Sequence, residues 1–413
     1  MTGSRPPAPA VQVGRPIVAA ARAAVTAFVG WLDAYGETSP DPYDFWNTSV
    51  GGRAKALYHR GGAVGKIAAA PFVALDTLVP RSRALVRRRG RSAIGDAHFA
   101  MGFFALAEAE PAEEARHVAR GLAFLEALDR QRSPGYEDPA WGYTFDWTTR
   151  YDVWPAGLPM ITTIPYAYEA FEAGYEAVTE PAYVETMEGI ARFAAEQIPV
   201  TPTGPGAEAG GYTPIDRRQV VNANAYRSFL LVTAGLRFGR EDWEEAGRRN
   251  LAYVVNSQRP NGSWPYSTDG TDVFVDNFHT CFVLKSLLKV WALTGDAQVR
   301  AAILRGYGFY LAHLIDEQGL PVPFAERPRL TLHRRDLYDY AEGINLAHLA
   351  RELIPEANDV LERLTSDLLE RWHLADGHFV TRELVVGRNT VPYHRWGQSQ
   401  TFRSLARLVA SDG

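Results

Sequence analysis

Cysteine is almost absent from this chain of 413 residues, since Cys281 is the only one. A single cysteine excludes an intramolecular disulfide and any zinc site built from several cysteines. Short catalytic motifs are missing as well: the sequence holds no HExxH pair, no GxxxxGKS/T loop, no GxGxxG after a predicted strand and no GxSxG elbow. These absences argue against zinc proteases, nucleotide-binding enzymes and serine esterases, and nothing in the sequence indicates a metal site.

A large charge of either sign is lacking too. The formal net charge of -5 gives no positive field over the whole molecule, so we expect no nucleic-acid partner. One local exception follows the apolar segment 67–79, where arginines crowd at Arg81, Arg83, Arg87, Arg88, Arg89 and Arg91. This stretch is either a solvated basic loop or a patch that meets anionic lipid or a phosphorylated substrate.

Long apolar runs are also lacking. No basic segment with an apolar run and a cleavage site opens the chain, and no apolar run reaches the roughly 18 residues of a membrane span. We therefore expect a cytoplasmic protein, with peripheral membrane contact through residues 67–91 left open. The composition, 46% hydrophobic and 22% charged, is that of a globular chain with a large core. Only residues 1–15, rich in Pro, Gly and Ala, are expected to be disordered.

A repeat of about 55 to 64 residues organises the rest of the sequence. Each unit runs from a polar cluster into an apolar helix, then into a charged amphipathic helix and a Gly- or Pro-containing loop. The six apolar helices are expected to open near 96–98, 159–160, 222–224, 276–279, 338–340 and 394–396. The charged helices are expected near 113–130, 182–198, 241–257, 297–315 and 357–372, and a helix at 16–34 supplies the sixth.

Alternation of these two helix types indicates two layers. Helices that are apolar all round lie inside, and one-sided amphipathic helices lie outside. Strand signals are sparse, with 379–386 and a few loop pieces as candidates for short β-hairpins. We therefore predict an all-α fold, an (α/α)6 barrel or six-hairpin toroid, with 16–413 as one domain and 60–92 as its apolar and basic N-terminal extension. All six polar clusters should then crowd one rim, around a concave site.

Two loops of this rim are dense in aromatic residues. Residues 136–151 read YEDPAWGYTFDWTTRY and residues 258–266 read QRPNGSWPY. Aromatic rings beside carboxylates and arginines suit sugars, whose CH faces stack on rings and whose hydroxyls need donors and acceptors. Asp146, Trp147, Arg150 and Trp264 are thus candidate substrate-binding residues. The alternative is that these rings only fill the barrel core.

The fifth inner helix opens with the polar residues best suited to acid and base chemistry. Tyr338, Glu342 and Asn345 share one face at spacings of four and three, so a phenol and a carboxylate can exchange a proton there. Tyr340 and Asp339 lie beside them. The alternative is a capping carboxylate at Asp339 with two buried tyrosines.

Two further helix starts hold polar clusters. Asp276 and His279 lie three apart beside Asn277, a spacing at which a carboxylate can hold the imidazole tautomer. Asn222 and Asn224 open the third inner helix, although Asn222 could be only an N-cap and His279 only a core residue.

Two more candidate sets complete the rim. Asp216 and Arg218 precede the third inner helix. The last inner helix opens with Tyr393, His394, Arg395 and Gln398, and Arg395 is suited to bind a carboxylate bidentately.

Four of these segments carry a resemblance to a known group. The helix starts VNANAY (221–226) and DNFHT (276–280), the loop QRPNGSWPY and the segment WGYTFDW (141–147) resemble bacterial and archaeal polysaccharide-biosynthesis proteins related to the C-terminal domain of D-glucuronyl C5-epimerases. The resemblance covers roughly residues 90 to 410. It implies the toroid fold and a polysaccharide, oligosaccharide or lipid-linked sugar as partner.

The same resemblance implies catalytic residues. In that family tyrosines, a glutamate and an arginine around the cleft are implicated, and a YDLRH-like segment lies near the C-terminus. Here the nearest match is 337–341, which places Tyr338 and Tyr340 on the family's tyrosine positions, although the Arg-His pair of the segment is absent.

These observations lead to a hypothesis of function. The protein is expected to invert C5 of a hexuronic acid, with Tyr338, Tyr340 and Glu342 as acid and base and with Arg395, His279 and Asn224 holding the carboxylate. Removal of a proton next to a carboxylate needs no organic cofactor.

Four alternatives remain open. A lyase shares the first step, and a glycoside hydrolase needs two carboxylates about 5 to 5.5 Å or 6.5 to 9.5 Å apart. A non-catalytic glycan-binding toroid keeps the aromatic rings alone. The loop at 258–264 also resembles the QW repeat of terpene cyclases, whose DxDD motif is absent. No oligomeric state is indicated.

Overall fold

A computed structural model describes residues 14–79, 88–149, 152–270, 272–327 and 331–411. Within these ranges six inner helices stand side by side and each packs on the next, the last against the first. They are α4 (Ala93–Ala109), α6 (Ile164–Val178), α8 (Val221–Phe238), α10 (Asn277–Thr294), α12 (Leu337–Ala350) and α14 (Ser399–Ala410).

An outer layer covers this ring, with one helix on each inner helix. Its members within the described ranges are α1 (Arg15–Tyr35), α5 (Glu114–Asp129), α7 (Pro181–Glu196), α9 (Glu241–Asn256), α11 (Ala297–His313) and α13 (Ala357–Asp367). The predicted (α/α)6 barrel is confirmed, and α1 is the sixth outer helix, as expected. Short π-helical turns η2 (Leu368–Trp372) and η3 (His394–Gln398) follow α13 and precede α14.

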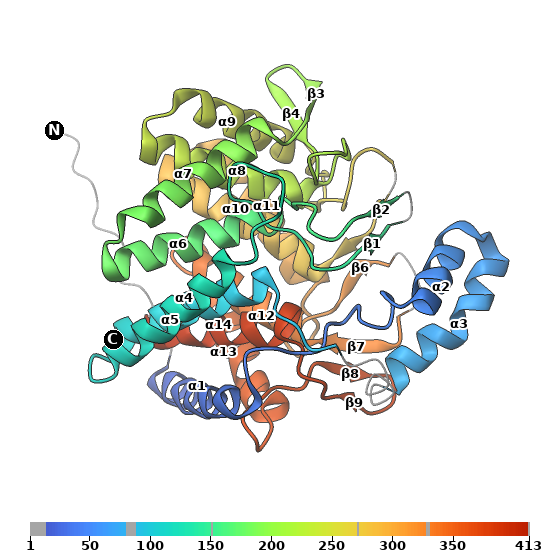
Figure 1. The fold of residues 1–413 in the computed structure, drawn as a ribbon, viewed down its shortest axis with the longest axis vertical. Coiled ribbons are helices and arrows are strands. Elements are labelled where there is room, and N and C mark those ends of the chain that lie inside the picture. The colour runs from blue at the N-terminus through green and yellow to red at the C-terminus, as the bar shows by residue number, and fades with distance from the viewer. Residues whose placement is uncertain (1–13, 80–87, 150–151, 271, 328–330, 412–413) are drawn as a thin grey trace.

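The ring closes where the two ends of the chain meet. Helix α1 packs on α14, which in turn packs on α4, and Figure 1 shows α1 beside the red C-terminal helices. The fully buried ring of Phe28 lies 5.4 Å from that of Phe402 and 6.3 Å from that of Phe99. Burial of one such side chain contributes about 1.5 to 3 kcal/mol, so this aromatic contact stabilises the closure.

Local signals in the sequence define several helix ends. The side chain of Ser92 accepts a hydrogen bond from the Gly95 N–H at the start of α4, and Asp276 accepts one from the His279 N–H at the start of α10. The cap of α12 is Asp336, not Asp339, because Asp336 accepts from the Tyr338 N–H. Helices α8 and α10 end at Gly239 and Gly295, both with φ near 65°.

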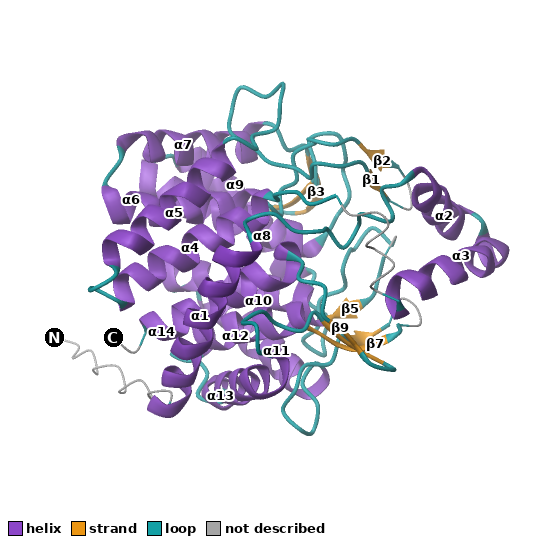
Figure 2. Ribbon diagram, turned by 60° about the horizontal axis from the view of Figure 1, so that its bottom comes forward, coloured by secondary structure: helices purple, strands orange, loops and turns teal. Residues whose placement is uncertain are grey.

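The loops that lead from an outer helix to the next inner helix gather at one end of the ring, and Figure 2 shows them as a loop-rich half beside the helical half. Short antiparallel pairs stiffen them. The strands are β1 (Trp147–Thr148), β2 (Val153–Trp154), β3 (Val200–Gly204), β4 (Ala207–Gly210), β5 (Val275–Asp276), β6 (Phe324–Glu326), β7 (His333–Asp336), β8 (Arg382–Leu384) and β9 (Arg388–Asn389). Of the predicted strand at 379–386, β8 forms the central part.

The predicted N-terminal extension is a helical hairpin. Helices α2 (Ser49–Arg60) and α3 (Gly62–Leu78) pack on each other and project from the loop-rich end of the ring (Figures 1 and 2). The hairpin begins earlier than residue 60. Arg81, Arg83 and Arg87 of the basic stretch, and nearly all of residues 1–15, lie outside the described residues.

One helix, Pro16–Tyr35 of α1, is long and apolar enough to cross a membrane by length and composition, which the sequence analysis did not expect. Arg22 and Asp33 interrupt a strictly apolar run, but the alanines between them keep the average hydropathy high. A core helix of a barrel meets the same criterion. In the structure Arg22 donates to Glu110 at 2.8 Å, and Phe28 and Leu32 are fully buried in the ring.

Two glycines of α11 provide a test of the packing between the layers. A Cβ on Gly306 would lie 2.3 Å from Cζ3 of Trp264, whereas a Cβ on Gly308 would meet nothing within 4 Å. Trp264 cannot easily give way, because its Nε1 donates to the Val254 carbonyl at 2.9 Å. Gly306→Ala should lower the free energy of unfolding by about 1 to 3 kcal/mol.

The matched variant, Gly308→Ala, should leave the free energy of unfolding unchanged or raise it by about 0.5 to 1 kcal/mol, because alanine is the better helix former. Chemical denaturation of both variants measures the difference. Equal effects of the two substitutions would contradict the close contact between α11 and Trp264.

Candidate active site

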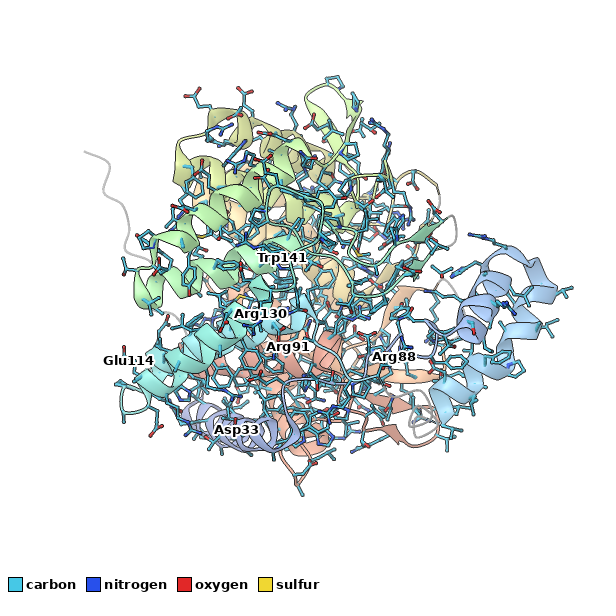
Figure 3. All side chains as sticks on the ribbon, in the orientation of Figure 1. Asp33, Arg88, Arg91, Glu114, Arg130 and Trp141 are labelled. Atoms are coloured by element: carbon cyan, nitrogen blue, oxygen red, sulfur yellow. The ribbon has the colours of Figure 1, made fainter. Side chains whose placement is uncertain are left out.

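A cleft of about 750 Å³ opens at the loop-rich end of the ring. Four stretches that are far apart in the sequence line it: residues 39–49 before and at the start of α2, 88–94 at the start of α4, 142–145 of the aromatic loop, and His394 and Arg395 of η3, together with Thr163. The side chains around it include those of Arg88 and Arg91, labelled in Figure 3. The volume is that of a site for a small ligand or for one or two sugar residues.

Arg395 is the most constrained charge of this cleft. Its guanidinium is 2% exposed and makes a bidentate ion pair with Asp41, with both N–O distances at 2.6 Å. Burial lowers the pKa of Arg395, but the Asp41 carboxylate more than reverses this, so the pKa lies above its ordinary value. Its third nitrogen, Nη1, is buried and has no hydrogen-bond acceptor among the described residues. A buried N–H without an acceptor is costly, which suits a site that receives an anion.

Aromatic rings surround the guanidinium of Arg395. Its Cζ lies 3.8 Å from the ring centre of Trp396 and 4.5 Å from that of Tyr143. Tyr143 and Phe145 line the cleft, and Tyr43, Trp147 and Trp396 pack on them. We call these five residues the aromatic cluster. The predicted candidate Trp147 therefore packs on Tyr143, which lines the cleft, but does not line the cleft itself.

Trp396 has an unusual backbone. Its φ of 60° and ψ of 39° lie in the left-handed region, which a bulky side chain seldom adopts. Such a conformation costs about 1 to 3 kcal/mol and concentrates at functional sites. Here it turns the chain between Arg395 and the start of α14, so that the Trp396 ring lies on the guanidinium.

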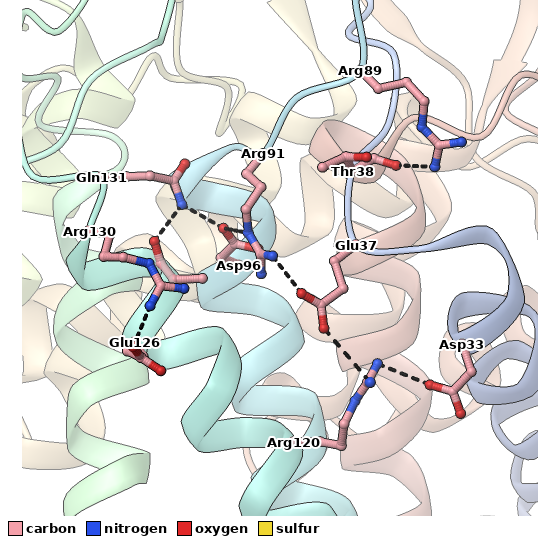
Figure 4. Close-up of polar contacts among 11 residues, drawn as sticks. Asp33, Glu37, Thr38, Arg89, Arg91, Asp96, Arg120, Glu126, Arg130 and Gln131 are labelled. Atoms are coloured by element: carbon pink, nitrogen blue, oxygen red, sulfur yellow. Dashed lines mark hydrogen bonds and ion pairs between the residues drawn. The ribbon is translucent and has the colours of Figure 1, made fainter.

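A second arginine forms the wall at the start of α4 (Figure 4). Arg91 donates to Asp96 at 3.0 and 3.1 Å and to Glu37 at 2.5 Å, and Gln131 donates to Asp96 at 2.6 Å. Burial outweighs the attraction of Arg91 and raises the pKa of Asp96 to about 6. Arg89 is fixed beside them by the carbonyls of Tyr35 and Thr38.

His394 is a neutral imidazole at this wall. Its ring packs edge-on against Trp31, Tyr35 and Phe99, and its backbone N–H donates to Ser39 Oγ at 2.9 Å. Burial first, and then the charges of Arg89 and Arg91, lower its pKa to about 3. Nε2 has no hydrogen-bond partner within the described part of the chain.

The predicted His279 and Asp276 form a pair, but beside a different cavity. The carboxylate holds Nδ1 of His279 at 2.7 Å, and the ring of Tyr266 lies 4.8 Å from the imidazole. Asn222 and Trp264 line the same space, which holds only about 10 Å³. Arg218 lies at its edge in an ion pair with Asp272 at 2.8 Å. This second cluster is too closed to admit a sugar.

Tyr338 connects the two clusters. Its buried ring stacks on Trp396 at 6.3 Å and lies 5.1 Å from the ring of Phe278. Burial raises its pKa well above the ordinary value. The fully buried Glu342 lies deeper in the ring, in an ion pair with Lys285. Neither side chain lines the cleft, so the structure does not bring the predicted acid and base to it.

Other predicted residues point away from the mouth. Tyr340 donates to Asp367 at 2.6 Å and packs on Trp372, toward the outer layer. Asp339 is buried, and its Oδ1 accepts no hydrogen bond from the described residues. Burial, and then the charges of Asp336 and Asp276, raise the pKa of Asp339 far above the ordinary value. Tyr340 thus lies away from the cleft, because successive residues of a helix face different sides.

Four predicted amide and indole residues clamp loops in place. Asn224 exchanges hydrogen bonds with the backbone of Gly210, and Asn277 donates to the carbonyls of Leu314 and Val322. Gln398 pairs in the same way with the backbone of Phe379, and Trp264 is the contact of α11 described above. These side chains satisfy buried backbone groups and hold the rim.

The remaining candidates lie in turns or outside the description. Asp216 accepts from the backbone of Thr213 and Arg218 and fixes a turn. Asp146 is exposed and accepts from the Ala156 N–H. Tyr393 is buried at the start of η3, where its carbonyl accepts from the Gln398 N–H. Arg150 lies outside the described residues.

The sequence analysis missed the segment 39–48. Asp41 and Asp44 of this segment line the cleft, and so does Asn47. The stretch 40–48 reads PDPYDFWNT, a density of aromatic, acidic and turn residues like that of the loop 136–151, and this signal could have marked it. Thr163 was also missed, and its buried Oγ1 has no partner among the described residues.

In the described part of the chain, no three histidine, cysteine or carboxylate side chains come together as a set of ligands for a metal ion.

Comparison with known proteins identifies the fold of this chain but not its family or function. No protein-family model matches the sequence, and no curated protein shows significant similarity to it. Among solved structures, an unsaturated glucuronyl hydrolase from Bacillus sp. GL1 is 13% identical with a TM-score of 0.59, and the match covers 95% of this chain and 96% of that one.

Two further neighbours cover less of the chain. Cellobiose 2-epimerase from Bacillus thermoamylovorans is 7% identical with a TM-score of 0.60, over 78% of this chain and 88% of that one. A GH76 α-mannanase from Bacteroides thetaiotaomicron is 10% identical with a TM-score of 0.59, over 78% and 86%. All share the (α/α)6 toroid.

The neutral state of His394 makes the stability of the protein depend on pH. In an unfolded chain an imidazole titrates near 6.5, whereas the folded pKa is about 3. Below pH 6.5 the His394 imidazole therefore binds a proton in the unfolded chain but stays neutral in the folded chain. The contribution of His394 to the free energy of unfolding is complete at pH 7.5 and falls by about 1.4 kcal/mol on acidification to pH 5.5.

His394→Gln should remove this contribution, because glutamine stays neutral at both pH values. The loss of unfolding free energy between pH 7.5 and 5.5, measured by denaturant titration, should be about 1.4 kcal/mol smaller in the variant. Burial also lowers the pKa of His348 on α12 to about 3, so His348→Gln should act alike. An unchanged pH dependence in both variants would contradict the neutral state.

Proposed function

We propose that this protein is a carbohydrate-active enzyme that binds a hexuronic acid residue of an oligosaccharide in the cleft, with the sugar carboxylate on Arg395. One observation carries the proposal: Arg395 is buried and already paired on one side with Asp41, while Nη1 has no acceptor among the described residues. A carboxylate at Nη1 would satisfy this donor.

The balance of charge around the cleft also favours an anion. Arg88, Arg89, Arg91 and Arg395 line it against two aspartates, Asp41 and Asp44. Arg91 is paired with Asp96 and Glu37 and Arg395 with Asp41, so Arg88 and Arg89 are the cations toward which a uronic acid would bring its negative charge.

Sugar rings and hydroxyls also find suitable groups. Tyr143 and Phe145 offer aromatic faces to the CH side of a pyranose. Asn47, Asp44 and Thr163 offer polar atoms for its hydroxyls. The neighbours in fold agree with this class, since the glucuronyl hydrolase from Bacillus sp. GL1 is described as responsible for the degradation of glycosaminoglycan.

For the reaction we favour proton abstraction at C5, next to the carboxylate. Arg395 would stabilise the negative charge that spreads onto the carboxylate when the proton leaves. His394 is the neutral base nearest to it in sequence and lines the same cleft. The arginines that depress the pKa of His394 would be partly neutralised by the substrate carboxylate, and this raises the basicity of the imidazole when substrate binds.

On the other face of the sugar Tyr143 is the acid candidate. Burial raises its pKa far above the ordinary value, so the phenol is protonated and able to donate. Return of a proton from that face gives the C5 epimer, and loss of the C4 substituent instead gives an unsaturated product. Tyr338 and Glu342, the acid and base expected from the sequence, remain one shell deeper.

Glycoside hydrolysis is the second candidate, and it too has an observation in its favour. Asp41 and Asp44 both line the cleft, whereas Asp146, Asp216, Asp339 and Glu342 do not and Asp276 lines only the small cavity. The Asp41 N–H donates to Asp44 at 2.7 Å. Asp41 and Asp44 are therefore the two carboxylates that a hydrolase would use.

The proposal predicts proton exchange at C5 of a bound uronic acid. Proton NMR of the purified protein with glucuronic-acid oligosaccharides in deuterated water should show deuterium at C5. Intact chains would identify an epimerase, a vinylic signal a lyase, and shortened chains without exchange a hydrolase. Equal activity on matched oligosaccharides of glucose would contradict recognition of the carboxylate.

Arg395→Lys should lower kcat/KM on uronic-acid substrates by at least about 100-fold, because lysine cannot hold Asp41 bidentately and present a further N–H. Arg240→Lys is the matched control, since Arg240 is an exposed residue that pairs with Asp242 at the start of α9. His394→Gln should abolish exchange while the oligosaccharide still binds. Binding without any exchange in the unmodified protein would indicate a glycan-binding protein instead.

A further inference from the structure

The hairpin of α2 and α3 carries an apolar surface that nothing in the described structure covers. On α3 an apolar stripe of Val64, Ile67, Pro71, Leu75 and Leu78 follows the spacing of one helix face. Val64 is 77% and Ile67 74% exposed, and Leu75 and Leu78 are more than two-fifths exposed. Val50 and Leu57 of α2 are exposed as well. Such a continuous apolar face marks an interaction surface.

Tight packing makes this surface a fixed feature of the hairpin. A Cβ on Gly65 would lie 2.1 Å from the Leu57 carbonyl oxygen, and a Cβ on Gly51 would lie 2.0 Å from that of Phe45. Gly65 therefore lets α3 approach α2 closely, Gly51 lets α2 approach the segment before it, and the buried residues of the two helices are small. The large apolar side chains of α3 are left on the outside.

The hairpin also carries positive charge. Arg53, Arg60 and Lys66 are exposed on it, and Arg88 and Arg89, which line the cleft, follow it in the sequence. Between residues 49 and 79 the one acidic residue is Asp76, which accepts from Trp46 Nε1 at 3.0 Å. An apolar face rimmed by cations is the pattern of helices that lie in the interface of an anionic bilayer.

We propose that the α2–α3 hairpin docks the protein on an anionic membrane surface, with the apolar stripe among the lipid chains and the cations at the phosphates. A second copy of the chain is a poorer occupant. In a two-fold symmetric contact two copies of this cationic hairpin would face each other, and like charges repel.

The cleft lies next to the docked surface. Asn47, Thr48 and Ser49 at the start of α2 line it, and so do Arg88 and Arg89. Lys55 of α2 reaches back to the aromatic cluster, with Nζ 4.6 Å from the ring centre of Tyr43 and 4.8 Å from that of Trp147. Docking would bring the cleft to the level of the headgroups. A lipid-linked acidic glycan is then the natural substrate, and this last step rests on the proposed function.

Vesicle flotation of the full chain tests the docking without any sugar. We expect the protein to float with vesicles of phosphatidylcholine and phosphatidylglycerol at about two to one and to stay behind with phosphatidylcholine alone. The double variant Val64→Glu, Ile67→Glu should bind at least about tenfold more weakly, because each carboxylate must enter the apolar layer. Arg53→Glu with Lys66→Glu should weaken binding as much.

The matched control is Leu236→Glu with Leu293→Glu, two exposed leucines near the C-terminal ends of α8 and α10, at the opposite end of the ring. This control should float like the unmodified protein. Absence of flotation with anionic vesicles would overturn the proposal, and so would equal loss in the control. A dimer in light scattering that Val64→Glu dissociates, without flotation, would replace it by a contact between copies.

C5 exchange on a soluble uronic-acid oligosaccharide is measured separately with the same variants. Hairpin variants that lose flotation and keep this exchange support the docking as a distinct property. Flotation without exchange would leave the docking standing and contradict the proposed function alone.

Discussion

Helix α1, near the start of the described chain, packs against α14, near its end, and α14 packs against α4, so that these contacts turn a row of helix pairs into a closed ring. Without α1 the outer face of α14 and the ring of Phe402 would lose their cover. The contact also brings residues 36–48 to the rim. From there Asp41 reaches Arg395 and Ser39 reaches His394, so one side of the cleft exists only because the ring is closed.

Burial of charge gives the cleft its character. The Arg395–Asp41 pair is removed from water, and removal of either partner would leave the other charge buried and uncompensated. Burial first, and then the charges of Arg89 and Arg91, keep His394 neutral, while the carboxylates of Asp96 and Glu37 hold Arg91. The charged groups of such a site are in place before any ligand arrives, so little free energy is spent on arranging them when an anion binds.

The sequence predicted the fold far better than the site. Polar clusters at helix starts and the alternation of two helix types depend on local pattern, and the observed inner helices begin within about five residues of the expected starts. The direction of a side chain within an inner helix was not predictable in that way. Inner helices are buried on both sides, so hydrophobicity does not distinguish the side that faces the axis of the ring from the side that faces the outer layer. Tyr340 and Asn224, expected at the site, bond Asp367 and the backbone of Gly210 instead.

Contacts between residues far apart in the chain could not be predicted from the sequence, for another reason. Arg395 was predicted to bind a carboxylate bidentately, and the structure shows such a pair, but with Asp41 of the chain itself, 354 residues away. Its role toward a substrate depends on the one nitrogen that this pair leaves over. Trp396 is similar, because its left-handed backbone cannot be read from residue type, which disfavours it.

The distance along the chain between α1 and α14 has a consequence for synthesis. Ser39 and His394, which meet beside this closure, are 355 residues apart, and a ribosome needs on the order of 20 to 70 seconds to cover that length. During this time α1 has left the ribosome with its apolar side bare, and its partner does not yet exist. The nascent protein therefore exposes the apolar face of α1 until the last helix emerges, and such a surface is one that chaperones bind.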